Sequence, residues 1–309
     1  MKAIGIILAG GNNNRMKELT AKRAVPALPV AGSFRAIDFS LSSMSNSHIQ
    51  TVAILTQYNA RSLNEHLSSS KWWNFGRKQG GLFLFTPTVT ADNSDWYRGT
   101  ADAMYQNIDF LKRRHEPYVI ISSGDCVYKL DFNRVLDFHI EKKSDITVVC
   151  KDMMYNDDVS RFGVVRMDEE SRITEFDEKP IEASSNTIST GIYVIRRRQL
   201  IELLEAAAEE NRFDFVNDIL VRYKNVKKIY GYKINSYWNN IADIDAYFKT
   251  NMDFLRPDVR SYFFREEPTI CSKVDDLPPA KFNPGSDISN SLVSSGCIIT
   301  VSYTHLTLP

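Results

Sequence analysis

The first apolar run of the chain, residues 3–9, leads directly into paired glycines at Gly10–Gly11 and then into a cation at Arg15. Glycines at the end of a strand let backbone N–H groups approach a phosphate chain closely, because no side chain stands in the way. Residues 22–26 then read Lys-Arg-Ala-Val-Pro, which places the apolar Val25 just before the proline. The pattern predicts a phosphate-binding loop that carries several cationic side chains and one apolar side chain, Val25.

Five further strings combine charged, hydroxyl or amide side chains with glycine or aromatic residues. They read Trp-Tyr-Arg-Gly-Thr-Ala-Asp at 96–102, Ser-Gly-Asp at 123–125, Glu-Lys-Pro at 178–180, Ser-Thr-Gly-Ile-Tyr at 189–193 and Tyr-Trp-Asn-Asn-Ile at 237–241. Open α/β sheets bind their ligands where strands end, so we expect these strings to meet there. Asp125 alone would be an ordinary turn or cap residue, and only the ordered set favours a functional interpretation.

The overall composition narrows the classes of partner and location. Lys and Arg together number 38, as do Asp and Glu, so the formal net charge is zero and no basic field favours nucleic acid. No apolar run approaches the roughly 20 residues of a bilayer span, and the N-terminus lacks the pattern of a secretion signal. The four cysteines lie far apart in the sequence, which is typical of reduced thiols. We therefore expect a cytoplasmic protein that contacts neither nucleic acid nor membrane.

Apolar runs alternate with helical patterns over about the first 250 residues, which indicates βαβ units with a mainly parallel sheet. The runs at 51–55, 118–121 and 145–149 are short, largely apolar and rich in β-branched residues, as in strands that are buried on both faces. We predict an α/β fold in which residues 1–255 form the first domain.

The character of the sequence changes after Arg256. Repeated prolines predict an extended linker over 256–285. From residue 286, short apolar steps alternate with small polar residues, as in the first coil of a hexapeptide β-solenoid. We predict that 286–309 form one coil of a truncated β-helix domain. We also expect that residues 301–309 do not continue its pattern and represent a truncation or a foreign junction.

Taken in order, these strings resemble the sugar-1-phosphate nucleotidylyltransferases, and specifically glucose-1-phosphate adenylyltransferase (ADP-glucose pyrophosphorylase) of bacterial glycogen synthesis. The resemblance covers nearly the whole chain and includes the strings at 38–42 and 55–59. It implies a Rossmann-like nucleotidyltransferase with a mainly parallel mixed sheet, followed by a left-handed β-helix. It also implies the reaction of ATP with glucose 1-phosphate to give ADP-glucose and pyrophosphate. In that reaction the sugar phosphate attacks the α-phosphate, so charge neutralisation and in-line positioning matter most.

The resemblance also implies roles for particular residues. It assigns the nucleotide phosphates to Gly10, Gly11 and Arg15, Mg²⁺ to Asp125, the glucose phosphate to Glu178 and Lys179, and the sugar pocket to Ser189 and Gly191. From the residues alone, Arg15 could instead pair locally with Glu18, and Lys179 could be a solvated turn cation.

Several positions depart from the pattern of a catalytic member of that family. Asn13-Asn14 stands where the family carries Gly-Thr, and Val25 stands where it carries lysine. Asn239-Asn240 replaces an Arg-Asp pair, and residues 86–88 lack the glutamine-bearing segment that reads adenine. Asn240 is a neutral ligand, whereas Mg²⁺ is held mainly by carboxylate and phosphate oxygens. The loss of one preorganised charge stabiliser typically costs about 10²- to 10³-fold in rate.

These departures resemble the GlgD-type subunits, the noncatalytic partners of a catalytic subunit in the same enzyme. We therefore expect a regulatory subunit, with degenerate positions at Val25 and Asn240 and no confident catalytic residue. Its partners would be a catalytic homologue in a hetero-oligomer, a tetramer by resemblance, with ATP, glucose 1-phosphate or ADP-glucose as ligands. Two alternatives stay open: an active adenylyltransferase in which Lys22 or Arg23 and Asp243 replace the lost groups, and a metabolite sensor that acts without assembly.

Overall fold

The computed structural model describes residues 2–11, 14–76, 80–88, 96–154, 157–301, 303–304 and 307–308. The strands of the α/β part are β1 (Ala3–Ala9), β2 (Pro29–Val30), β3 (Phe34–Arg35), β4 (Thr51–Thr56), β5 (Gly81–Phe85), β6 (Tyr118–Ser123), β7 (Cys126–Tyr128), β8 (Ile146–Asp152), β9 (Gly163–Met167), β10 (Ile173–Glu178), β11 (Thr187–Arg196), β12 (Ile229–Lys233) and β13 (Trp238–Asn240). The later strands are β14 (Lys281–Phe282), β15 (Ile288–Ser289), β16 (Leu292–Val293), β17 (Ile298–Ile299), β18 (Tyr303–Thr304) and β19 (Thr307–Leu308).

The α-helices are α1 (Ala36–Asn46), α2 (Arg61–Leu67), α3 (Thr100–Gln106), α4 (Ile108–Lys112), α5 (Phe132–Glu141), α6 (Arg197–Glu209), α7 (Ile244–Asp253) and α8 (Pro257–Phe264). Shorter helical turns are η1 (Asn14–Thr20), η2 (Val25–Ala27) and η3 (Ser70–Trp73), which are 3₁₀, and η4 (Val216–Val221), which is a π-helix. Within the described residues, no helix has both the length and the apolar character needed to cross a bilayer.

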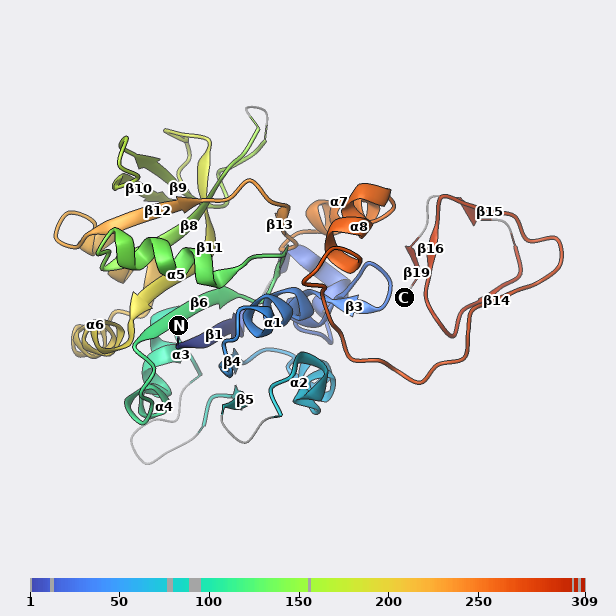
Figure 1. The fold of residues 1–309 in the computed structure, drawn as a ribbon, viewed down its shortest axis with the longest axis horizontal. Coiled ribbons are helices and arrows are strands. Elements are labelled where there is room, and N and C mark those ends of the chain that lie inside the picture. Colours follow the sequence, from blue (N-terminus) through green and yellow to red (C-terminus); the bar gives the residue numbers. More distant parts are fainter. Residues whose placement is uncertain are drawn as a thin grey trace.

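The described residues form a nine-stranded mixed sheet (Figure 1). Seven strands follow the order β10-β9-β11-β6-β1-β4-β5, and in addition β8 pairs with β11 and β12 pairs with β8. β1 pairs in parallel with β4 and β6, β4 with β5, and β8 with β12. β11 runs antiparallel to β6, β8 and β9. The prediction of an α/β fold with a mainly parallel mixed sheet is confirmed.

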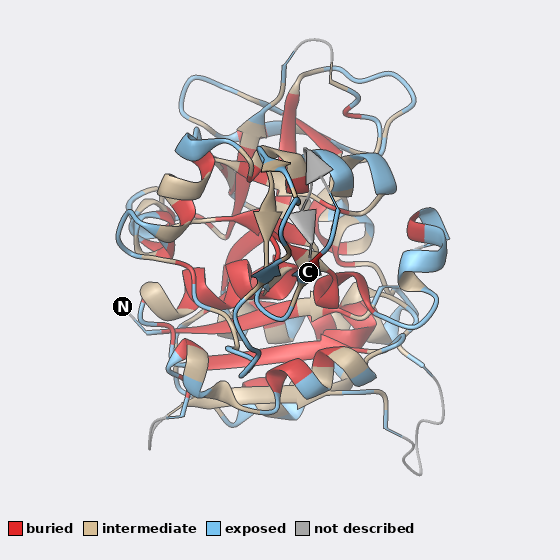
Figure 2. Cartoon of the chain, turned by 90° about the vertical axis from the view of Figure 1, so that its right-hand side faces the viewer, coloured by how far each residue is buried: buried red, intermediate tan, exposed pale blue. Residues whose placement is uncertain are grey.

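Helices cover both faces of this sheet because the central strands are apolar on both sides. Alternate residues of β1 divide between two cores, with Ile7 in one and Ile4 in the other. The first core takes side chains from α1, α2 and α5, and the second takes side chains from α3, α4, α6 and η4. Buried residues concentrate in the sheet and on the inner faces of these helices (Figure 2).

A third core fixes the segment that follows β13. Phe39 on α1 packs edge-to-face against Phe263 of α8, and Phe263 lies 5.3 Å from Phe254 between ring centroids. Val25 of η2 belongs to the same cluster. Aromatic pairs of this kind add packing energy beyond the area they bury. The cluster therefore seats α7 and α8 against the loop that follows β1.

The C-terminal part differs in two respects from the sequence expectation. An extended linker was expected from 256, but Pro257 starts α8, because proline suits the first position of a helix. Residues 301–309 were expected not to continue the solenoid pattern, yet β18 and β19 pair in parallel with β15 and β16. With the parallel pair of β14 and β17, these strands are compatible with the start of a β-helix, set apart from the main sheet (Figure 1). The domain boundaries stay a prediction.

His139 of α5 is a buried titratable group in this framework. Its Nδ1 lies 2.8 Å from Thr147 Oγ1, and its ring packs edge-to-face on Tyr118. Burial, and then the nearby charge of Arg196, lower the pKa of His139 from 6.5 to about 4. The folded state therefore keeps this imidazole neutral at pH values where the unfolded chain binds a proton.

This linkage predicts that acid weakens the fold through His139. As the pH falls from about 6.5 toward about 4, the unfolded chain gains a proton that the folded chain does not, which lowers the free energy of unfolding by about 3 kcal/mol in total. His139→Gln should remove this part of the acid sensitivity, and His115→Gln, at an exposed position, should not. Urea unfolding at about pH 7.5 and about pH 5 measures how much the free energy of unfolding falls between the two pH values. An equal fall for wild type and His139→Gln would contradict the prediction.

Candidate active site

The first cavity of the site lies where β1, β4 and β6 end. It has a volume of about 520 Å³ and is lined by residues from the ends of these strands and from the 97–103 segment: Gly10, Gly11, Val25, Pro26, Gln57, Tyr58, Tyr97, Arg98, Gly99, Thr100, Ala103, Ser123 and Asp125, with Leu8, Ala9 and Leu55. β4 and β6 flank β1 on opposite sides. α1, which leads from β1 to β4, packs in the first core, whereas α3 and α4, which lead to β6, pack in the second core on the other face. Open α/β sheets bind ligands at such a change of strand order.

The paired glycines differ in what their environment requires. A Cβ on Gly10 would lie 3.2 Å from Gln57 Cβ and 3.3 Å from Gln57 N, so the strand ends there would have to shift by a few tenths of an ångström to admit a side chain. A Cβ on Gly11 would meet no atom of the described residues within 4 Å. Gly10 is thus closely packed, whereas Gly11 leaves open space in the cavity wall. This space is compatible with the predicted close approach of phosphate.

A second cavity of about 230 Å³ adjoins the first. It is lined by Ser123, Asp125, Cys126, Arg161, Phe162, Gly163, Glu178, Lys179, Ser189, Thr190, Gly191, Tyr193, Val216, Trp238 and Asn240. Ser123 and Asp125 line both cavities. The structure therefore brings together the four residues predicted for the sugar phosphate, and it places Asp125 at the junction of the two cavities.

Local backbone geometry sets this second cavity. Lys179 has a positive φ of 51°, and its N–H donates to Phe162 O at 3.1 Å, which turns the chain at the end of β10. Its Nζ lies 3.1 Å from Glu178 Oε1. Gly191 has φ of 75° at an irregularity in the pairing of β11 with β8, where most side chains would be strained. Ser189 Oγ donates to Tyr193 OH at 3.3 Å.

Asp125 directly precedes β7, and Asn240 of β13 pairs in register with Cys126, the first residue of β7. Asp125 Oδ1 accepts a hydrogen bond from Ser123 Oγ at 2.5 Å, and its backbone carbonyl accepts from Ile241 N at 2.9 Å. Asn240 Oδ1 accepts from Ala242 N at 3.0 Å, and its Nδ2 donates to Cys126 Sγ at 3.4 Å. The amide oxygen of Asn240 is therefore already engaged by the backbone.

The donor set does not fit a metal ion held by two carboxylates. Asp125 supplies one carboxylate, and the opposite strand presents a neutral amide. In the part of the chain that the structure describes, no three His, Cys, Asp or Glu side chains are placed together to hold a metal. Because Mg²⁺ prefers carboxylate and phosphate oxygens, these residues alone make a weak magnesium site.

Val25 stands in the wall of the first cavity. η2 is only three residues long, and Val25 is 4% exposed and packs within the third core. Lys22 and Arg23 precede it on exposed positions, and neither is among the residues that line the two cavities. Arg15 is likewise exposed on η1 and does not line either cavity. Asn13 lies outside the described residues.

Asp243 has two roles that sequence reasoning did not foresee. Its Oδ1 accepts from Ala246 N at 2.7 Å, which caps the N-terminus of α7. The same carboxylate forms an ion pair with Arg161, a residue of the connection between β8 and β9. Asp243 is therefore occupied by the helix end and by Arg161.

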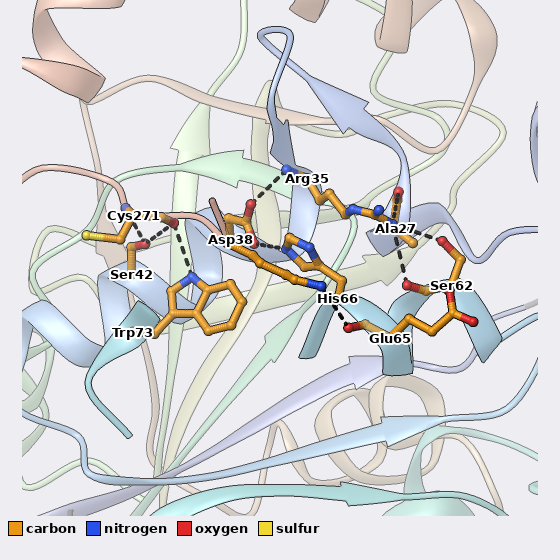
Figure 3. Close-up of polar contacts among 10 residues, drawn as sticks. Ala27, Arg35, Asp38, Ser42, Ser62, Glu65, His66, Trp73 and Cys271 are labelled. Carbon is orange, nitrogen blue, oxygen red and sulfur yellow. Dashed lines mark hydrogen bonds and ion pairs between the residues drawn. The ribbon is translucent and has the colours of Figure 1, made fainter. Parts of the chain in front are cut away.

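A polar cluster of Arg35, Asp38, Ser62 and His66 holds η2 in place (Figure 3). Arg35 Nη1 donates to Ala27 O at 3.3 Å and to Ser62 Oγ at 2.9 Å, which joins η2 to α2. Asp38 Oδ2 accepts from Arg35 N at 2.8 Å, and Asp38 Oδ1 lies 2.6 Å from His66 Nε2. Asp38 and His66 are both buried, so this cluster is a satisfied polar core that fixes the start of α1.

The same region holds the segment that leaves α8. Ser42 Oγ donates to Cys271 O at 3.1 Å and accepts from Cys271 N at 2.9 Å (Figure 3). Trp73 Nε1 donates to the same carbonyl at 3.1 Å. The path toward the C-terminal strands is thus anchored on α1 and η3.

Several residues that shape the site were not assigned from the sequence. Trp238 is buried, lines the second cavity and has a buried indole Nε1 that finds no hydrogen-bond partner among the described residues. Gln57 Oε1 accepts from Tyr97 N at 2.7 Å, which attaches the 96–102 string to the end of β4. Arg98 lies over the Phe213 ring at 3.8 Å and lines the first cavity. Trp238, Gln57 and Arg98 lie within the sequence segments that were singled out above, whereas Arg161 lies outside all of these segments.

The cluster around Arg35 predicts a specific loss of stability. Arg35→Met should lower the free energy of unfolding by about 2 kcal/mol, because partly buried carbonyl and hydroxyl acceptors lose a charged donor. Arg61→Met, at an exposed position at the start of α2, is the matched control and should change stability little. Urea denaturation measures both, and an equal effect of the two substitutions would show that the cluster does not hold η2.

Comparison with known proteins agrees with this geometry. The profile of the Nucleotidyl transferase family matches residues 4–256. Glucose-1-phosphate adenylyltransferase of Clostridium acetobutylicum is 39% identical over 299 residues, which cover 96% of this chain and 78% of that protein. The enzymes of the same name from Pseudothermotoga lettingae and Bacillus cereus are 38% and 36% identical, with 96% and 99% of this chain and 71% and 82% of theirs covered. The chain thus belongs to the nucleotidyl transferase family, in the group of glucose-1-phosphate adenylyltransferases.

Proposed function

We propose that the chain is a subunit of an ADP-glucose-forming enzyme of GlgD type, which binds substrates but turns them over weakly or not at all. Its partner in this proposal is a catalytic homologue, whose activity it raises within a hetero-oligomer. The relatives named glucose-1-phosphate adenylyltransferase support the substrates, ATP and glucose 1-phosphate. The degenerate charge set of the site supports the regulatory role.

The observation that carries this proposal is Val25 in the wall of the nucleotide cavity. Attack on the α-phosphate expels pyrophosphate, so negative charge develops on the leaving group. A cation fixed beside that group stabilises the transition state more than the ground state, which is what increases the rate. Val25 cannot supply this charge, and the neighbouring Lys22 and Arg23 do not line the cavity.

The second support is Asn240. The amide is neutral and its oxygen accepts from Ala242 N, so it adds no charge for a metal ion beside Asp125. We assign no catalytic step to a metal here. The carboxylate of Asp125 would be the one charged protein ligand for a Mg²⁺ ion that accompanies a bound triphosphate.

The remaining residues support ligand binding. Gly11 leaves open space at the end of β1, and Arg98 contributes a cation to the wall of the nucleotide cavity. Glu178 and Lys179 share the smaller cavity with Ser189 and Trp238. Carboxylate, ammonium, hydroxyl and indole groups together match the donors and acceptors of a sugar phosphate. Binding without turnover is the combination that a regulatory subunit needs.

The alternative of an active enzyme with substitute groups lacks structural support. Asp243 caps α7 and pairs with Arg161, so it is not available to replace a carboxylate at position 240. Lys22 and Arg23 are exposed outside the cavity wall.

The direct test is an activity assay of the purified protein with ATP, glucose 1-phosphate and Mg²⁺, alone and after mixing with a catalytic homologue. We expect little ADP-glucose from the chain alone and a higher rate from the mixture than from the homologue alone. Robust turnover by the isolated chain would overturn the proposal, as would an unchanged rate in the mixture.

Restoring the missing charges should restore activity. The double variant Val25→Lys with Asn240→Asp should increase ADP-glucose formation by at least about tenfold, because each lost charge typically costs 10²- to 10³-fold. A matched control is Val226→Lys with Asn235→Asp, which makes the same changes at exposed positions. If both double variants behave alike, the charge deficit at the cavity is not what limits turnover.

A further inference from the structure

Arg161 is the feature of the second cavity that the proposed function leaves unexplained. It lies in the connection between β8 and β9, its side chain is 26% exposed, and it lines the cavity together with Lys179. Its guanidinium is 4.9 Å from the centroid of the Phe162 ring and pairs with Asp243 at the start of α7. A partly desolvated arginine therefore faces the cavity next to Asn240, where the site lacks a second carboxylate.

The charges around the cavity define what it can bind. The charged residues of its described lining are Asp125, Arg161, Glu178 and Lys179. Glu178 offsets the charge of Lys179, and Asp243, which is not part of the lining, offsets that of Arg161. Both cations are thus held by carboxylates that a ligand can displace.

We propose that Arg161 supplies to this cavity the positive charge that a metal ion would otherwise bring, so that the cavity binds phosphate monoesters without metal. This inference rests on the proposed function. It adds the class of ligand that the second cavity binds and states that this binding needs no metal ion. The disagreement between the donor set and a two-carboxylate metal site is its starting point. Where an Asp125–Asn240 pair cannot hold a divalent ion well, a fixed guanidinium can neutralise phosphate instead.

Guanidinium chemistry suits this role. Its planar fork donates two parallel hydrogen bonds to phosphate oxygens, and it keeps its charge at every physiological pH. Burial lowers the pKa of Arg161 and the charge of Arg15 lowers it further, whereas Asp158 raises it. The protonated side chain thus lies in a partly desolvated place near a second cation, and an anion bound there relieves both costs.

Asp243 can release Arg161 without becoming unpaired. Its Oδ1 still accepts from Ala246 N, and a carboxylate at a helix N-terminus is stabilised by the helix dipole. The exchange of Asp243 for a phosphate at Arg161 therefore leaves each charge with a partner.

Isothermal titration calorimetry of the full chain tests the inference with glucose 1-phosphate and inorganic phosphate as probes. In EDTA and in Mg²⁺ we expect dissociation constants for glucose 1-phosphate that agree within about twofold. Arg161→Gln should weaken binding by about tenfold or more, which is the typical size of a charge-assisted hydrogen bond. Arg166→Gln on β9 is the matched control, because Arg166 pairs with Glu175 on the exposed surface and should leave binding unchanged.

Two further variants keep the test independent of folding defects. Asp243→Asn retains a good cap for α7 and removes the competing carboxylate, so it should tighten phosphate binding. Asn240→Asp adds a carboxylate beside Asp125 and should make binding stronger in Mg²⁺ than in EDTA. Unchanged or weaker binding by Asp243→Asn would overturn the inference, because Arg161 would then not be the group that the anion reaches.

The inference and the proposed function fail in different ways. Binding by wild type only in Mg²⁺, no binding in either buffer, or equal losses for Arg161→Gln and Arg166→Gln would overturn the role of Arg161. None of these results concerns turnover. Formation of ADP-glucose by the isolated chain would overturn the regulatory proposal instead, whatever the binding data show.

Discussion

The end of β6 is the constraint on which both cavities depend. Gly124 N donates to Leu8 O at 2.9 Å, and Asp125 O accepts from Ile241 N at 2.9 Å, so this turn joins β1, β6 and the chain after β13. A Cβ on Gly124 would lie 3.1 Å from Pro26 Cγ, which shows how closely the turn approaches η2. The two cavities meet at Asp125 because these backbone contacts bring the strand ends together.

This arrangement gives two adjoining cavities whose described lining carries few charges. The backbone of β1, β6 and β11 shapes the cavities that we propose for a nucleotide and a sugar phosphate, and that shape depends on strand pairing rather than on catalytic side chains. The residues at positions 25 and 240 are compatible with this pairing, because Val25 packs in a core and Asn240 accepts a hydrogen bond from Ala242 N. A site of this kind can bind its ligands without turning them over. Binding depends on shape and hydrogen bonds, whereas turnover needs charged groups placed where the opposite charge develops in the transition state.

Much of this was predictable because local patterns determined it. Buried strands came from apolar β-branched runs, and the strings that end them identified most of the site. The ion pair of Arg161 with Asp243 was not predictable, since 82 residues separate the two and nothing local links them. The indole of Trp238, which has no hydrogen-bond partner in the described part of the chain, and the engaged amide of Asn240 are also properties of the packed structure. The sequence likewise could not place α8, because prolines at a helix start and in a linker look alike.

A single-turnover experiment tests the central claim most directly. The isolated chain, in excess over labelled ATP and with glucose 1-phosphate and Mg²⁺, would bind its ligands while product is followed over one catalytic cycle. The account predicts bound nucleotide and almost no labelled ADP-glucose, because the site retains its shape but lacks a cation and a carboxylate. Stoichiometric ADP-glucose in that first cycle would contradict it.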